Sequence, residues 1–369
     1  MTVNSDHLLS SYGYELPIER IAQTPVTPRD SSKLLVVGGG DRLKHHIFRD
    51  LPQLLESGDL LVLNNTKVIP ARLYGHKTTG APVEVLLLEE KQPNYWLALV
   101  KPGKRLKPGS KILFSHHPTE HLDTSPFMAT VVERDEATGG RWLQLTIPPD
   151  RTFDDLLQEF GHVPLPPYIT DSQALPEQYQ TVYAQELGSS AAPTAGLHFT
   201  KELLENLKAK NIDTAFITLH VGVGTFRPVE VEDVTTHKMH GEWLEVSPEV
   251  VAKIQQTQAV GGRVIAVGTT AVRALEAAAA TGKLQPFIGK TELYIYPGYQ
   301  WRVVQGMVTN FHLPRSSLLL LVASLIGRSR LMEVYQEAID QDYRFYSFGD
   351  AMLITPEAVI KPVGCVSEA

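Results

Sequence analysis

The segment Arg263-Val-Ile-Ala-Val-Gly-Thr-Thr-Ala-Val-Arg-Ala-Leu-Glu276 decides the fold class of this chain. It predicts a short buried strand, a turn at a glycine and a helix that opens with hydroxyl residues. Thr269 or Thr270 is expected to cap this helix, where free amides and the positive end of the helix dipole suit a carboxylate or a phosphate. A strand-to-helix junction without a ligand is the alternative. Arg273 and Glu276 lie three residues apart, so they are expected to pair on one helix face.

Strands and helices alternate on both sides of this segment. The predicted strands are 33–37, 60–63, 214–221, 263–267, 292–296 and 301–308. The predicted helices are 51–56, 201–208, 248–256, 270–280, 317–326 and 331–339. Such alternation indicates α/β layers around a largely buried sheet.

The stretch from Pro70 to about Pro149 lacks any helical period. It contains five short apolar runs that turn residues separate, namely 82–88, 95–100, 111–114, 127–133 and 142–147. Short strands at this spacing predict a small barrel or sandwich. A helix over 152–160 and a proline-rich hinge over 161–168 follow. We therefore predict a discontinuous α/β main domain, 1–69 and 158–369, with a β-barrel domain inserted at 70–157.

Composition restricts the class of protein. The chain has 369 residues, more than the roughly 250 to 300 at which one core stops growing, so at least two packing units are expected. No apolar run approaches the roughly 18 residues of a membrane span, and the N-terminus lacks the pattern of an export signal. A cytoplasmic location is therefore expected. The net charge of −7 argues against a protein that coats nucleic acid indiscriminately, and the one cysteine, Cys365, excludes a disulfide within the chain.

Two glycine-containing loops are candidates for ligand binding. In Leu219-His-Val-Gly-Val-Gly-Thr-Phe-Arg227, the arginine occupies the place of the third glycine of a dinucleotide fingerprint, so that fingerprint is absent. This loop either lines a ligand, with His220 at its entry, or is a tight turn. In Ala192-Pro-Thr-Ala-Gly-Leu-His-Phe-Thr-Lys201, Thr194 and His198 could hold a polar ligand before a helix capped by Thr200. A structural role for His198 is the alternative.

Histidines and cations form two further candidate sites. If the segment around His240 is a strand, His240 and Glu242 point the same way and could act as an acid–base pair, whereas His237 would point to the opposite face. We predict no metal site. The run Lys101-Pro-Gly-Lys-Arg-Leu-Lys107 in the β-rich stretch is the densest basic cluster of an acidic chain. It is a candidate for contact with a phosphate backbone, although such runs are often only solvated.

From Tyr14 to Ile354, the chain resembles the S-adenosylmethionine:tRNA ribosyltransferase-isomerases, which act in queuosine biosynthesis. The most specific blocks are Asn64-Asn-Thr-Lys-Val-Ile-Pro-Ala-Arg72, Pro193-Thr-Ala-Gly-Leu-His-Phe199, Leu219-His-Val-Gly-Val-Gly-Thr-Phe226, Gly268-Thr-Thr-Ala-Val-Arg-Ala-Leu-Glu276 and Thr309-Asn-Phe-His-Leu-Pro314. The family usually has Asn-Asp-Thr-Arg at the start of the first block, whereas this chain has Asn65 and Lys67. A role that needs a carboxylate or a guanidinium at these two positions is therefore in question.

The resemblance implies a reaction and a set of site residues. The ribosyl group of S-adenosylmethionine is transferred to 7-aminomethyl-7-deazaguanine at the anticodon wobble position of tRNA and isomerised, which leaves epoxyqueuosine and releases adenine and methionine. In the mechanism proposed for the family, a base removes a proton beside the sulfonium, adenine leaves, the substrate amine attacks, and methionine departs as the epoxide closes. The resemblance also implies an α/β domain with an inserted β-barrel, and the chemistry requires no metal or redox cofactor.

The residues expected to carry this reaction fall into three groups. The acid and base candidates are His198, His220, His240 and His312. Arg273 is expected to hold the methionine carboxylate, and Gly222 and Gly224 to pass close to the adenosine. The other substrate-binding candidates are Thr194, Gly196, Thr225, Arg227, Thr269 and Thr270. The tRNA-binding candidates are Lys101, Lys104, Arg105 and Lys107, and the enzyme is expected to be a monomer.

The sequence is also compatible with two other functions. A tRNA methyltransferase would share S-adenosylmethionine but would release S-adenosylhomocysteine, and it normally uses a glycine loop that this chain lacks. A noncatalytic tRNA-binding module would use the β-rich stretch and its basic turn without any dependence on S-adenosylmethionine.

Overall fold

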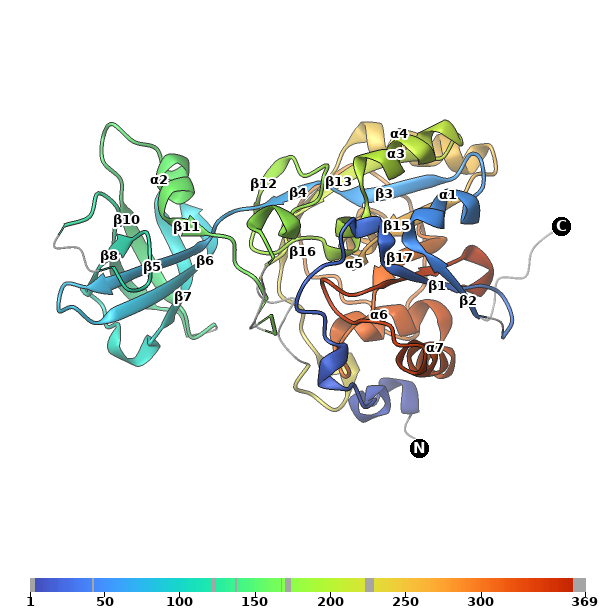
Figure 1. Ribbon diagram of the computed structural model, residues 1–369, viewed down its shortest axis with the longest axis horizontal. Coiled ribbons are helices and arrows are strands. Elements are labelled where there is room, and N and C mark those ends of the chain that lie inside the picture. The colour runs from blue at the N-terminus through green and yellow to red at the C-terminus, as the bar shows by residue number, and fades with distance from the viewer. Residues whose placement is uncertain are drawn as a thin grey trace. The chain divides into compact units, whose positions relative to one another are not determined.

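The computed structural model describes residues 4–41, 43–120, 124–136, 138–166, 168–169, 174–222 and 229–360. The chain forms two compact units (Figure 1). The main unit comprises Met1–Thr66, Pro167–Glu186 and Ala192–Ala369, and the β unit comprises Lys67–Pro166 and Leu187–Ala191. A mixed α/β fold with an inserted barrel is thereby confirmed.

The main unit is built on a nine-stranded mixed sheet in the order β16-β14-β13-β3-β15-β17-β18-β1-β2. Its centre is parallel and consists of β13 (Asp213–Leu219), β3 (Leu60–Asn64), β15 (Val264–Val267) and β17 (Gly306–Asn310). The flanking strands are β14 (Glu242–Val246), β16 (Phe287–Thr291), β18 (Ala351–Ile354), β1 (Lys33–Val37) and β2 (Leu43–Ile47). All residues of β3, β15 and β17 are buried, as their continuous apolar runs require.

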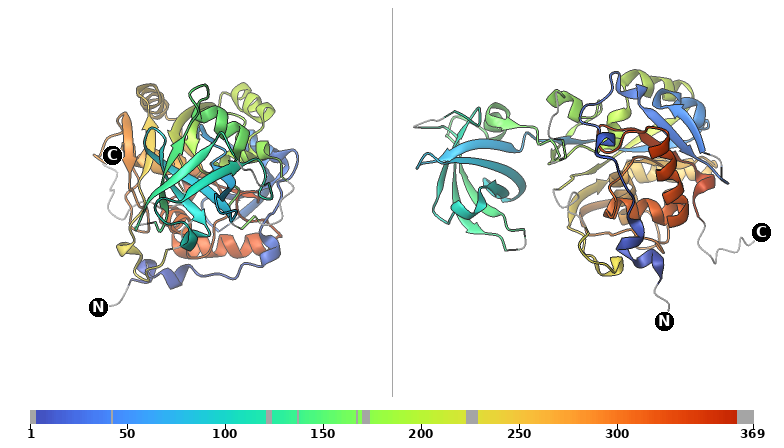
Figure 2. Two further views of the ribbon diagram at one scale, coloured as in Figure 1. Left: turned by 90° about the vertical axis from the view of Figure 1, so that its left-hand side faces the viewer. Right: turned by 60° about the horizontal axis from the view of Figure 1, so that its bottom comes forward.

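Helices cover both faces of this sheet. On one face, α1 (Leu51–Leu54) and α3 (Lys201–Ala209) pack on alternate residues of the strands, such as Leu61, Leu63 and Ile265. The other helices of the unit are α4 (Pro248–Ala259), α5 (Thr269–Ala278), α6 (Ser317–Ile326) and α7 (Arg328–Asp340). Figures 1 and 2 show α6 and α7 together on the side away from α1 and α3. Among the described residues, no helix is long and apolar enough to cross a membrane.

The helix α5 differs from its prediction in two details. Every one of its residues is buried, and it packs on β13, β14 and β15. Neither Thr269 nor Thr270 caps it, because the N-cap position is Gly268, whose φ of 87° favours glycine. Arg273 and Glu276 do not pair with each other, since each finds partners on other elements. The capping of α3 by Thr200, which accepts from the Leu203 amide, is confirmed.

The β unit is a closed antiparallel barrel. Its sheet has the order β11-β5-β6-β7-β10-β9-β8, and pairing of β5 with β8 closes it. The strands are β5 (Arg72–Lys77), β6 (Pro82–Gln92), β7 (Tyr95–Lys101), β8 (Lys111–Ser115), β9 (Met128–Arg134), β10 (Arg141–Thr146) and β11 (Gly161–His162). The helix α2 (Phe153–Phe160) contributes Leu156, Leu157 and Phe160 to the barrel core. Residues 67–69, 158–166 and 187–191, which were expected in the main domain, group with this unit.

The chain passes between the units at two short strands, β4 (Thr66–Val68) and β12 (Glu186–Ser189), which pair with each other. Elsewhere the predicted strand at 292–296 is wrong, because the strand is β16, five residues earlier. The predicted strand at 301–308 is wrong in its first half, since β17 begins at Gly306. The aromatic residues Tyr294 and Tyr296 favoured a strand in the prediction. In the structure their rings pack on each other outside any strand.

Candidate functional site

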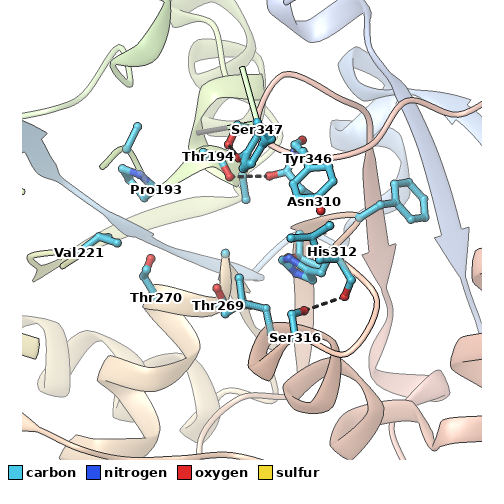
Figure 3. A pocket seen from close by; sticks show the side chains of 18 of the residues that line it. Pro193, Thr194, Val221, Thr269, Thr270, Asn310, His312, Ser316, Tyr346 and Ser347 are labelled. Carbon is cyan, nitrogen blue, oxygen red and sulfur yellow. Dashed lines mark hydrogen bonds between the residues drawn. The ribbon is translucent and has the colours of Figure 1, made fainter. Parts of the chain in front are cut away.

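A cavity of about 480 Å³ lies in the main unit at the carboxyl ends of β15 and β17 (Figure 3). Ligands of α/β proteins bind at this edge of the sheet, because the loops that leave the parallel strands meet there. The cavity is lined by residues 192–195, 268–270, 309–316 and 346–347, together with Tyr168, Val221 and Leu318. Its walls are mostly apolar with a few polar groups, as in small-molecule sites.

The turn from β15 into α5 forms one wall. Gly268, Thr269 and Thr270 all line the cavity. The helix starts there without a side-chain cap, so its first amides have no partner within the helix. The Thr270 hydroxyl oxygen is buried and has no hydrogen-bond partner among the described residues.

The segment that follows β17 carries a histidine that lines the cavity. This residue is His312, and its Nε2 lies 2.9 Å from the Thr309 hydroxyl. Its backbone is held on both sides, because its amide donates to the Tyr335 hydroxyl at 2.8 Å and its carbonyl accepts from the Tyr14 hydroxyl. Burial lowers the pKa of His312 to about 3, so the imidazole is neutral near pH 7.

Asn310 connects this wall to the opposite one. Its side-chain oxygen accepts from the Thr194 hydroxyl at 3.1 Å (Figure 3), and its amide nitrogen donates to the Tyr346 carbonyl at 3.1 Å. The same amide nitrogen lies 3.1 Å from Nε2 of His198. Asn310 is buried, so these bonds fix both the amide orientation and the position of Thr194 at the cavity.

His198 lies behind the cavity rather than in it. Its side chain is fully buried, with Nδ1 2.6 Å from the Ser32 hydroxyl and Nε2 3.2 Å from the Arg29 guanidinium. Both partners of Nε2, Arg29 and Asn310, are donors, so Nε2 accepts and the ring proton is on Nδ1. Burial, reinforced by Arg29 and Arg344, holds its pKa well below the usual value. His198 therefore supports Asn310, and a direct catalytic role is not favoured.

Two tyrosine rings form an aromatic wall. Tyr168 and Tyr346 lie with ring centroids 4.3 Å apart, and the Tyr168 hydroxyl bonds to that of Ser347. Tyr346 has a φ of 72°, a left-handed conformation that is uncommon for a bulky residue. Such strain is retained where surrounding contacts impose it, and it often accompanies binding sites.

Several predicted site residues lie outside the cavity. His220 does not line it; its Nδ1 is 2.8 Å from the Thr66 hydroxyl and its ring stacks on Trp243. His240 is exposed and precedes β14, so the expected pairing with Glu242 on one strand face is wrong. Gly196 is buried behind the cavity, where an added Cβ would lie 2.0 Å from the Tyr183 hydroxyl.

Arg273, the expected carboxylate clamp, does not line the cavity, and its Nη2 is buried without a hydrogen-bond partner among the described residues. Its guanidinium is buried, pairs with Glu242 and donates to the Leu293 carbonyl at 3.1 Å. Glu242 also accepts from the Gly222 amide at 3.1 Å, so the start of the glycine loop is bound to this ion pair. The remaining predicted residues of that loop, Gly224, Thr225 and Arg227, lie outside the described residues.

The basic run lies on the surface of the β unit. Lys101, Lys104, Arg105 and Lys107 are all exposed. Behind them the buried Arg141 donates to the carbonyls of Gly103 at 2.6 Å and Leu106 at 2.8 Å, which fixes the backbone of the turn. Contact with tRNA at this turn stays a prediction.

Sequence reasoning missed Tyr168, Asn310 and Tyr346. The block Thr309–Pro314 did provide a signal for Asn310, but only its histidine was selected. The two tyrosines are 178 residues apart and only the fold brings them together. Within the described ranges, no three His, Cys, Asp or Glu side chains gather as metal ligands would.

Comparisons with known proteins identify relatives over nearly the whole chain. A family model described as queuosine biosynthesis protein matches residues 9–354. The S-adenosylmethionine:tRNA ribosyltransferase-isomerase of Nostoc sp. is 63% identical over 371 residues, which cover 96% of this chain and 94% of the relative. The enzyme of the same name from Desulforamulus reducens is 48% identical over 349 residues, with 94% and 99% covered.

A solved structure is also similar. The crystal structure of S-adenosylmethionine tRNA ribosyltransferase from Thermotoga maritima has a TM-score of 0.53 and 39% sequence identity to this chain. The match covers 93% of this chain and 99% of the other.

Proposed function

This chain belongs to the queuosine biosynthesis family of S-adenosylmethionine:tRNA ribosyltransferase-isomerases, and we propose that the cavity at the ends of β15 and β17 is its active site. The enzyme makes epoxyqueuosine in tRNA with S-adenosylmethionine as co-substrate. The observation that carries the proposal is the convergence of two family blocks, Gly268–Glu276 and Thr309–Pro314, on one cavity together with Thr194 of a third.

The cavity suits a nucleoside with a charged sulfur. Its volume of about 480 Å³ lies within the range of small-molecule sites. The apolar walls and the tyrosines favour burial of an adenine ring, and the Tyr346 ring face is suited to a cation such as a sulfonium. The hydroxyl of Thr194 and the side-chain oxygen of Asn310, each of which can still accept a hydrogen bond, offer polar contacts for a ribose (Figure 3).

His312 is the best-placed base of the four histidines, because it alone among them lines the cavity. Its neutral ring can accept a proton from the carbon beside the sulfonium. The low pKa makes it a weak base, so proton removal depends on the acidifying effect of the sulfonium and on close positioning. Thr309, at 2.9 Å from Nε2, orients the ring for this step.

The products test the reaction and separate it from its alternatives. The chain is incubated with S-adenosylmethionine and tRNA that carries 7-aminomethyl-7-deazaguanine, and both the small molecules and the nucleosides are analysed. We expect adenine, methionine and epoxyqueuosine in equal amounts. S-adenosylhomocysteine would indicate a methyltransferase, and unchanged S-adenosylmethionine with bound tRNA would indicate a binding module.

We also propose that the basic run of the β unit contacts the tRNA backbone and that the enzyme acts as a cytoplasmic monomer without a prosthetic group. The exposure of all four cations supports the first part. Light scattering during gel filtration tests the second, and a mass near twice the 40.9 kDa of the chain would contradict it.

A further inference from the structure

No side chain of α5 caps the start of this helix. The helix has ten residues and begins at the cavity after Gly268. Its first amides therefore point toward the cavity without partners in the helix, at the positive end of its dipole. The start of α6 differs, because Ser316 caps it by accepting from the Leu319 amide at 3.2 Å.

A second observation marks the same place. The Thr270 hydroxyl oxygen is buried and unpartnered, and the residue is only 8% exposed although it lines the cavity. Figure 3 shows this oxygen directed away from the helix, on the side of Val221. An unpaired buried hydroxyl is costly, so a ligand that accepts its hydrogen bond gains affinity.

The charges around the cavity favour an anion at this point. None of the described residues that line the cavity is Asp or Glu, and Arg315 is the one cationic side chain among them. His312 also lines the cavity, but its ring is neutral near pH 7. Arg273, one turn further along α5, is already neutralised by Glu242. The amides and Thr270 are thus the groups left to receive a negative charge on this wall.

We propose that the N-terminus of α5 and the Thr270 hydroxyl bind the carboxylate of the methionine part of S-adenosylmethionine. This proposal rests on the function proposed above. The carboxylate is the only anionic group of S-adenosylmethionine near pH 7, so the site fixes which end of the donor enters this wall. The adenosine is then directed to the wall of Asn310, Tyr346 and Ser347, which lies across the cavity in Figure 3.

The test combines a hydroxyl deletion with a carboxylate deletion. S-adenosylmethionine and its decarboxylated analogue, which ends in the aminopropyl group, are titrated calorimetrically into the full chain. Unmodified tRNA is present throughout, so that ordered binding does not hide the donor site. The proteins are the wild type, Thr270→Val, Thr270→Ser and, as a matched control, Thr194→Val on the opposite wall.

We expect Thr270→Val to weaken binding of S-adenosylmethionine by about 10- to 100-fold, as for a hydrogen bond to a charged group, and to leave binding of the analogue nearly unchanged. Thr270→Ser keeps the hydroxyl and should retain most of the affinity. Thr194→Val should affect both ligands by the same factor.

An equal effect of Thr270→Val on both ligands would overturn the carboxylate site, and so would no effect on either ligand when Thr194→Val still weakens binding; in both cases the cavity remains the donor site. If all the Thr194 and Thr270 variants bind S-adenosylmethionine as the wild type does, the proposed cavity itself is overturned. Circular dichroism of each variant checks its fold, and if Thr270→Val is misfolded, the comparison is made with Thr270→Ala.

Discussion

At the residue scale, the neutral state of His312 is the feature on which the chemistry depends. We expect His312→Gln to lower kcat by about 10²- to 10⁴-fold, the usual contribution of a general base, with a smaller change in KM for S-adenosylmethionine. Adenine release in single-turnover reactions is the measurement. His45→Gln, a change to an exposed histidine of β2, is the control and should keep wild-type activity. Release by His312→Gln at the wild-type rate would exclude His312 as the base.

The two buried histidines also make stability depend on pH. Burial lowers the pKa of His312 to about 3 and that of His198 well below its usual value. The unfolded chain therefore takes up protons below about pH 6.5 that the native chain does not, so stability is lost as the pH falls from there. For His312 this loss is on the order of 1 kcal/mol at pH 5.5 relative to pH 8, and His198 adds to it in the same direction.

Urea unfolding followed by helical circular dichroism, which comes chiefly from the main unit, measures this loss. His312→Gln should reduce the loss of unfolding free energy between pH 8 and pH 5.5 by the part that His312 contributes. An equal loss in the variant and the wild type would show that His312 takes up its proton in the native state.

Single residues were predictable where their role is local. Thr200 follows from the capping pattern because its partner, the Leu203 amide, is three residues away. The partner of Arg273 is Glu242, on a different strand, and nothing in the helical spacing indicates it. The role of His198 depends on Ser32, Arg29 and Asn310, which are remote in the chain, so its sequence neighbourhood could not distinguish support from catalysis.

At the scale of elements, the glycine turn before α5 determines where the helix starts relative to the cavity. Gly268 has a φ of 87°, and Gly282, outside the cavity, has a φ of 97°. Alanine at either position should cost about 1–2 kcal/mol, because a Cβ disfavours left-handed backbone. Only Gly268→Ala should also weaken binding of S-adenosylmethionine, since it moves the first amides of α5.

Urea unfolding and calorimetric titration of both variants compare the two effects. Gly282→Ala serves as the stability-matched control. If both variants bind S-adenosylmethionine as the wild type does, the start of α5 is not part of the donor site.

Elements with a strong pattern were predicted, and weak ones were not. The strand before Gly268 and the leucine-rich helix α6 were predicted correctly, because elements that are buried on all sides have continuous apolar sequences. The strand β2 has the sequence LKHHI and only partial burial, so its pairing with β1 leaves little trace in hydrophobicity. The strand β18 is four residues long and depends on neighbours from distant parts of the chain.

At the scale of the whole molecule, the β unit and the main unit are expected to bind different substrates. Changing Lys101, Lys104 and Lys107 to Gln should raise KM for tRNA and reduce the salt dependence of binding by about 0.7 to 0.9 per lost phosphate contact. Affinity for S-adenosylmethionine alone should not change. Filter binding of tRNA across a range of salt concentrations measures the slope.

The matched control changes Lys201, Lys208 and Lys210, which are also exposed, to Gln and removes the same charge from the main unit. If both triple variants lose equal affinity for tRNA, net charge rather than the basic turn governs binding.

The overall architecture was predictable because the alternation of helices and strands stops at Pro70 and resumes near the hinge. The extent of the β unit was harder to predict, since α2 has the amphipathic pattern of any surface helix. Only the packing of Leu156, Leu157 and Phe160 inside the barrel assigns it to that unit. The part of the cavity lining that lies in family blocks directly after predicted strands could be inferred from the sequence. The pairing of Tyr168 with Tyr346 could not, because only the fold brings these two rings together.

A crystal structure of the chain with S-adenosylmethionine bound tests the central claim most directly. We expect the donor in the cavity at the ends of β15 and β17, with its carboxylate at Thr270 and the carbon beside its sulfonium facing the His312 ring. Donor density anywhere else in the molecule, with this cavity empty, would contradict the account.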